Sequence, residues 1–144
     1  MKKLYVEAAL DAYKYLDRNI KLLDTRITRK AMGAVRNYNK PYEELAVEII
    51  ELQAIKFDLV SLKKAIDDVL AGLKTHTKAY VYRNYLHLPM ADIPSYLPLK
   101  NSDRLLAKFG AAIEAVGIDN RTFKEMSDLR VIRESLYHVT HKKQ

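Results

Sequence analysis

The chain has 144 residues, with 25 lysines and arginines against 18 aspartates and glutamates, for a formal net charge of +7. That length fits one domain, or one domain with an extended arm, and can bury a core without covalent staples. The absence of cysteine excludes disulfide frameworks and thiolate chemistry, four glycines and four prolines argue against a turn-rich β-sandwich, and no stretch is apolar enough for a membrane span.

The first predicted helix covers residues 3–36. Its apolar residues recur at steps of three and four, which is the spacing of one face of an α-helix. Gly33 and the Asn-Tyr-Asn run at 37–39 end the pattern and predict a short polar joint. The stripe contains Leu16, Ile20, Leu23 and Ile27, and Val6, Leu10 and Tyr13 extend it upstream.

The second predicted helix, from about Pro41 to Lys74, has the clearest pattern in the chain. One apolar set recurs every seven residues and a second set follows three residues later, as in the a/d seam of a coiled coil. Glu48 is the one polar member of the second set. Two long helices with a short joint predict an antiparallel hairpin, whose spare apolar flank would cover the C-terminal half or a second copy of the chain. We assign Leu45, Leu52, Leu59 and Ile66 to the hairpin or dimer seam, which continues to Leu73 and includes Ile55, Leu62 and Val69.

Shorter helices are predicted after the hairpin. One covers 78–86 and is broken by Pro89, a second covers 92–97, and a third covers 102–116 and stops at Gly117. The apolar face of the third helix comprises Leu105, Leu106, Phe109, Ile113 and Val116.

A last helix is predicted from about Asn120, which we expect to cap it, to Val139. Its inward face comprises Met126, Leu129, Ile132, Leu136 and Val139. The expected architecture is therefore all-α, with a scaffold or dimerisation hairpin at 1–74, a helix-turn-helix unit at 75–118 and a C-terminal helix and tail at 119–144.

The three helices within 78–116 have the spacing of a helix-turn-helix with its supporting first helix. Residues 74–113 hold six basic and two acidic side chains, which suits a polyanion. A helix in the major groove needs hydrogen-bonding or cationic side chains at its exposed positions, and neighbouring cations hold phosphates. The predicted base-reading residues are Asn101, Ser102, Arg104 and Lys108, and the predicted phosphate contacts are Lys78, Arg83 and Lys100.

Residues 16–116 resemble a family of small phage regulators, the ArpU/RinA-like activators of Gram-positive phages. The glutamate-rich heptads at 45–73 resemble the family's second helix, and Tyr-Arg-Asn-Tyr-Leu at 82–86 resembles its stretch before a sigma-factor region 4-like helix-turn-helix. Asp-Ile at 92–93 resembles the opening of helix two, Leu-Pro-Leu-Lys-Asn-Ser at 97–102 its turn, and Ala-Ile at 112–113 the end of its recognition helix. The resemblance implies DNA binding at phage promoters.

Two prolines depart from the family pattern. Pro94 stands where the family carries alanine, and because proline lacks an N–H, helix two would begin late with Asp92 as its cap. Pro98 replaces the usual glycine or asparagine of the turn.

The sequence therefore predicts a dimeric, sequence-specific regulator that binds double-stranded DNA, and the resemblance implies that it acts on phage or mobile-element genes in the cytoplasm of a bacterial host. No paired carboxylates, Ser/His/Asp set or phosphate-binding glycine loop is present, so no enzyme and no cofactor are expected. His138 and His141 share a helical face without a third ligand, so no metal site is expected. Two alternatives remain open: an interaction module or inhibitor that binds another regulator or RNA polymerase, and a basic RNA- or packaging-associated phage factor.

Overall fold

The structure is a computed structural model that describes residues 1–36, 42–89 and 102–128. Every regular element in these ranges is helical, which confirms the predicted all-α fold. In chain order the elements are α1 (Lys3–Arg36), α2 (Tyr42–Ala71), α3 (Thr75–Val81), a single π-helical turn η1 (Tyr82–Leu86), α4 (Ser102–Ala115) and α5 (Asn120–Asp128).

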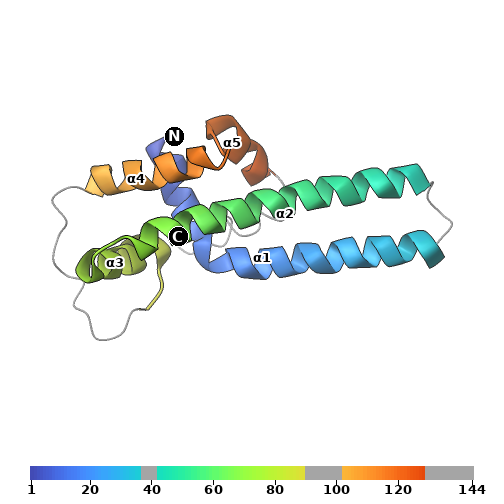
Figure 1. Ribbon diagram of the computed structural model, residues 1–144, viewed down its shortest axis with the longest axis horizontal. Helices are drawn as coiled ribbons and strands as arrows, with labels where there is room; N and C mark the ends of the chain where they lie inside the picture. Colours follow the sequence, from blue (N-terminus) through green and yellow to red (C-terminus); the bar gives the residue numbers. More distant parts are fainter. Residues whose placement is uncertain (37–41, 90–101, 129–144) are drawn as a thin grey trace, which may run out of the picture.

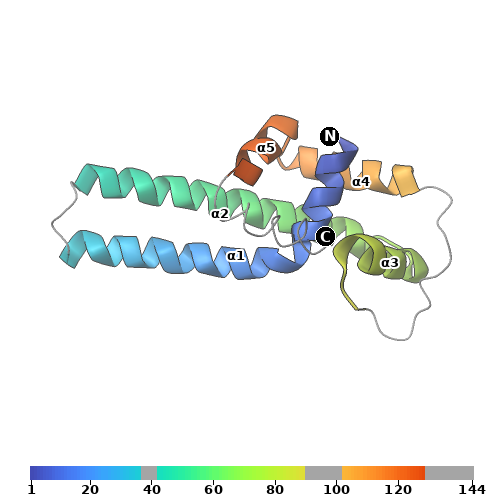
Figure 2. The ribbon, with the colours of Figure 1, turned by 180° about the vertical axis from the view of Figure 1, so that it is seen from behind.

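The two long helices run side by side as a hairpin, and the shorter helices gather around the end of the hairpin that is remote from its tip (Figure 1). α4 lies along the other side of α2 from the long, straight part of α1. The first turns of α1 bend across α2 and reach α4, which is seen best from behind (Figure 2). The chain's beginning therefore closes over a helix that lies about 100 residues later.

The predicted seam lies between α1 and α2 of the same chain. Leu59 and Ile66 are buried in it, while Leu45 and Leu52 are half-buried closer to the tip. Cross-helix ion pairs flank the seam: the Lys30 ammonium lies 2.7 Å from Glu48, the polar seam residue, and Lys56 lies 2.5 Å from Asp24. These two ion pairs fix the antiparallel register of the hairpin.

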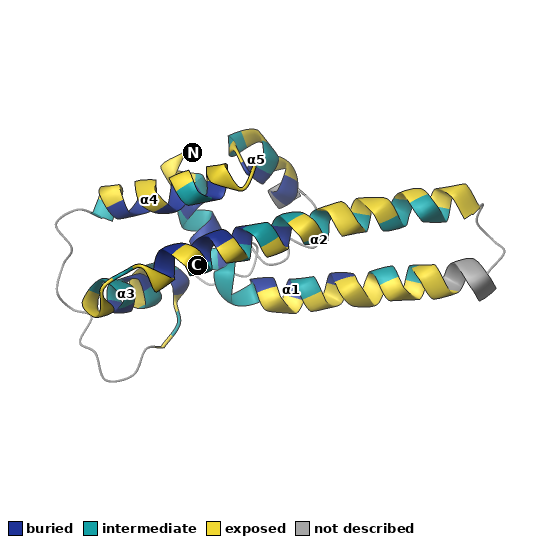
Figure 3. Cartoon of the chain, in the orientation of Figure 1, coloured by how far each residue is buried: buried dark blue, intermediate teal, exposed yellow. Residues whose placement is uncertain are grey.

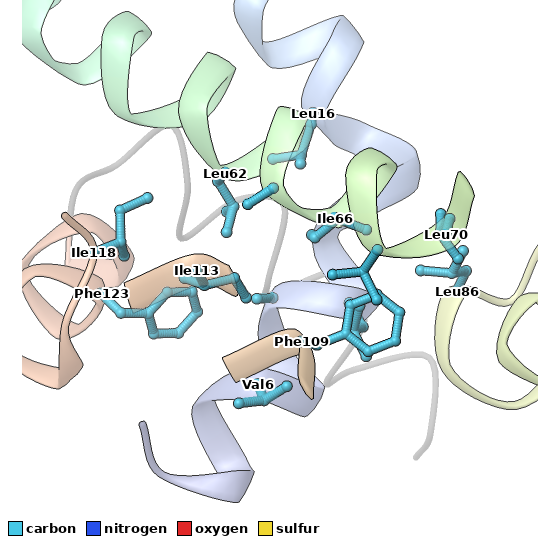
Figure 4. Close-up of a cluster of buried hydrophobic side chains, with 14 of the residues drawn as sticks. Val6, Leu16, Leu62, Ile66, Leu70, Leu86, Phe109, Ile113, Ile118 and Phe123 are labelled. Atoms are coloured by element: carbon cyan, nitrogen blue, oxygen red, sulfur yellow. The ribbon is translucent and has the colours of Figure 1, made fainter. Parts of the chain in front are cut away.

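Burial is concentrated at the end of the hairpin that carries α4, and the half that leads to the tip is mostly exposed (Figure 3). Phe109 and Ile113 project from α4 toward Ile66 and Leu62 of α2 (Figure 4). One cluster of buried side chains includes residues from each of the predicted segments 1–74, 75–118 and 119–144. The described parts of these segments thus share a single core.

The structure changes several predicted helix ends. The helix predicted at 78–86 begins at Thr75 rather than Lys78, as α3, and it continues into η1. His87, directly after η1, adopts a left-handed conformation with φ of 54°, and its Nε2 lies 2.9 Å from Asp11 of α1. The predicted joint at 37–39, the helix at 92–97 and the part of the last helix beyond residue 128 lie outside the described residues.

The connection between α4 and α5 corrects two sequence predictions. Gly117 takes a φ of 91° and ends α4 as predicted, but Val116 is 37% exposed because the helix stops at Ala115 before this residue can turn inward. The cap of α5 is Asp119 rather than Asn120: its carboxylate accepts a hydrogen bond from the Thr122 N–H at 2.8 Å, which lowers the pKa of Asp119. Asn120 instead accepts a hydrogen bond from the Lys2 N–H at 2.7 Å.

A tyrosine links the two hairpin helices near the α4 end. The Tyr13 hydroxyl donates a hydrogen bond to Asp67, which also lies 3.3 Å from Lys63. Burial is the larger cause that raises the pKa of Tyr13 above its usual value of about 10, and this hydrogen bond to a carboxylate is the next. In the folded chain Tyr13 therefore keeps its proton at a pH where an unfolded chain loses it.

We expect the contribution of Tyr13 to stability to be intact below pH 10 and to disappear as the pH rises above 10, because ionisation then favours the unfolded chain. Tyr13→Phe should destabilise the protein by about 1 kcal/mol at pH 7 and should flatten the decline above pH 10. Urea unfolding at several pH values measures both effects. Tyr42→Phe, at a residue that is 75% exposed, is the matched control, and equal pH profiles for both variants would contradict the assignment.

Candidate nucleic-acid interface

α4 is an amphipathic helix whose inner side is fixed in the core. Gly110 permits a close approach to α1, because a Cβ atom at this position would lie 3.1 Å from Val6 Cγ2. α4 packs on both α1 and α2, so it has a defined position relative to the rest of the described chain. Its buried residues are Leu105, Leu106, Phe109, Gly110 and Ile113.

The outward face of α4 combines two cations with small side chains. Arg104 and Lys108 are exposed and lie one turn apart, and neither forms an ion pair with a described residue. The remaining positions of this face are alanines, which leave the backbone accessible to a broad partner surface. The outward face of α4 comprises Arg104, Ala107, Lys108, Ala111 and Ala115.

The carboxylates nearest this face already have cationic partners. The Asp103 carboxylate forms an ion pair with the Lys3 ammonium at 2.8 Å, and this pair raises the pKa of Lys3. Glu114 pairs with the amino group of Met1. Both carboxylates lie on one flank of α4, so the outward face itself presents positive charge.

The other predicted base-reading residues differ in their placement. Ser102 is half-buried at the start of α4. Asn101, together with Lys100 of the predicted phosphate set and the unusual Pro94 and Pro98, lies outside the described residues.

Two predicted phosphate contacts lie on the α3–η1 unit. Arg83 is exposed on η1. Lys78 is half-buried, and its ammonium lies 6.0 Å from the centre of the Tyr82 ring, a cation–π arrangement that holds the side chain along its own helix. The rings of Tyr80 and Tyr85 meet edge to face at 6.0 Å, so these tyrosines pack within the unit.

Sequence reasoning missed the lysines at the start of the chain. The first turns of α1 lie against α4, so Lys3 reaches Asp103, and Lys2 is exposed between α4 and α5 with its backbone bonded to Asn120. No local pattern could have revealed this, because the contacting positions are 100 or more residues apart in the sequence.

No protein-family model, curated protein or solved structure matches this chain. Within the described ranges no helix is both long and apolar enough to cross a membrane. The same residues contain no group of three or more histidine, aspartate or glutamate side chains placed to hold a metal ion.

Proposed function

We propose that this chain is a sequence-specific regulator that binds double-stranded DNA with α4 in the major groove. The observation that carries the proposal is the outward face of α4, where Arg104 and Lys108 project from a surface of alanines while the opposite face is buried. The major groove is about 12 Å wide and admits one α-helix, provided that the exposed face carries no bulky apolar side chain.

The exposed cations of α4 and η1 suit two different tasks. An arginine can donate two hydrogen bonds to the O6 and N7 atoms of a guanine, and lysine makes a similar contact as a point charge. Arg104 and Lys108 are therefore assigned to base edges. Arg83 is assigned to a phosphate, which sets the register of the protein on DNA without reading sequence.

The proposed target genes, host and partners follow from the resemblance to the ArpU/RinA-like phage activators. We propose control of phage or mobile-element promoters in the cytoplasm of a bacterial host, by binding and without enzymatic chemistry or a cofactor. A homodimer that reads two half-sites, and contact with RNA polymerase or another regulator, belong to the same proposal. Two half-sites would be separated by about 34 Å or a multiple of that distance.

The test is fluorescence anisotropy with labelled DNA from upstream of the chain's own gene, titrated with salt and with random competitor DNA. Three to four phosphate contacts would give a slope of about −3 to −4 in a plot of log K against log salt concentration. Binding that persists in excess competitor and weakens along this slope supports the proposal. No binding at low salt, or complete loss to random competitor, contradicts sequence-specific recognition.

One observation favours the alternative that the chain is a protein-interaction module. Large apolar side chains on α2, including Ile50 and Phe57, are exposed on the side that faces neither α1 nor α4. DNA binding by α4 does not use these residues. They are compatible with a regulator that has a second, protein-binding surface.

A further inference from the structure

The tip half of α2 carries a second apolar stripe in addition to the seam that packs on α1. Val47, Ile50 and Phe57 are 54%, 63% and 69% exposed, although comparable side chains closer to α4 are buried. Together with the exposed Ala54 they follow steps of three, four and three residues, which is the a/d spacing of a helix that packs on another helix. Val47, Ile50, Ala54 and Phe57 are called the α2 stripe below.

The two flanks of the α2 stripe differ in charge. One flank carries Glu44, Glu51 and Asp58 at seven-residue intervals, and neither Glu44 nor Glu51 forms an ion pair with a described residue. Residues 42–58 contain five carboxylates and one lysine, and that lysine is paired with Asp24. A hollow lies along this acidic side of the helix, and it is lined by Glu43, Glu44, Val47, Glu48 and Glu51.

The opposite flank carries no charge. It consists of Ala46, Gln53 and the 43%-exposed Val60, also at seven-residue intervals. A helix packed on the α2 stripe would therefore meet carboxylates along one edge and small or apolar groups along the other. Such an arrangement selects both the charge and the orientation of the partner.

A second copy of α2 fits this surface poorly. An antiparallel pair that matches Val47 with Phe57 would place Glu51 against Glu51 of the other copy, and Glu44 against Asp58, so like charges would face each other. In a parallel pair, the carboxylates of each copy would face the uncharged flank of the other copy and would gain no cationic partner. The charge of the flank instead favours a cationic partner.

We propose that the α2 stripe binds a basic amphipathic helix of another protein, with apolar residues at three- and four-residue steps and lysines or arginines along one edge. This surface is separate from α4, so the inference does not depend on DNA binding. In a regulator the arrangement would let one chain contact DNA and a partner protein at the same time. Complementary charge would orient the partner helix, and the apolar stripe would supply most of the affinity.

The test uses a labelled 21-residue model helix with leucine at a and d, lysine along one edge and alanine and glutamine along the other. We expect binding that weakens about ten-fold with Phe57→Ser and several-fold with Glu44→Gln combined with Glu51→Gln. Val116→Ser and Glu125→Gln are the matched controls, because they change exposed residues that do not belong to α2. A peptide with glutamate in place of lysine should not bind.

Three outcomes would overturn the inference. The first is equal affinity for the lysine and glutamate peptides, or no effect of Phe57→Ser. The second is a concentration-dependent dimer, measured by sedimentation, that Phe57→Ser abolishes, since the stripe would then hold a second copy. The third is peptide binding that occurs only after removal of residues 129–144, since the chain's own basic C-terminus would then be the occupant.

Discussion

Phe109→Ala is expected to lower the free energy of unfolding by about 3–5 kcal/mol. The Phe109 side chain is completely buried where α4 meets the hairpin, and its removal leaves a cavity that the packed neighbours on α1 and α2 fill only in part (Figure 4). In a chain of this length the melting temperature should fall by about 10 °C. Thermal and urea unfolding, followed by circular dichroism at 222 nm, measure the change.

The control for this prediction makes the same chemical change in solvent. Phe57 is 69% exposed, so Phe57→Ala should alter the unfolding free energy by less than about 0.5 kcal/mol. A loss below 1 kcal/mol for Phe109→Ala, or equal losses for both variants, would show that α4 is not seated on the hairpin.

Arg104→Ala should relax base preference at one position of the DNA site, with a loss of about 1–3 kcal/mol for the preferred base. The reason is that a bidentate contact to one guanine distinguishes that base from the other three. Lys100→Ala should weaken all sequences alike, because a phosphate contact carries no base information. Affinities for a set of single-substitution probes at fixed salt separate the two patterns.

Arg29→Ala provides the arginine control, since Arg29 is exposed on the tip half of α1, far along the hairpin from α4. Its affinity profile should match that of the wild type. If Arg104→Ala and Lys100→Ala both bind every probe as the wild type does, α4 is not the recognition helix. The alternative of a protein-interaction module, with the exposed apolar side chains of α2 as its binding surface, would then replace the proposed function.

The sequence predicted the features that repeat locally. The heptads gave the α2 seam with Leu59 and Ile66, and the inward residues of α4 were correct from Leu105 to Ile113, because helical spacing alone determines which side chains share a face. The error at Val116 arose at a helix end, where the backbone leaves that spacing. The same reasoning applies to Asp119, since several residues before a helix can serve as its cap.

Relations between distant segments were beyond the reach of these patterns. α2 has apolar residues on two sides, and spacing does not tell which side packs on α1 and which, as at Ile50, remains exposed. The contact of Val6 with Gly110 has no local signal, because it depends on how α1 bends across α2. For the same reason, the lysines beside α4 were not among the predicted site residues.

The contact between the first turns of α1 and α4 also determines the order in which the chain can mature during translation. At about 5–20 residues per second, the ribosome reaches Gly110 about 5–20 seconds after Val6. A hairpin of neighbouring helices forms far faster than this interval of synthesis. α1 and α2 can therefore pair while the surface on which α4 will pack is still exposed to solvent. The first turns of α1 are thus synthesised before α4 and covered only after it, and nascent chains that end before α4 would expose Val6 to other nascent chains or to chaperones.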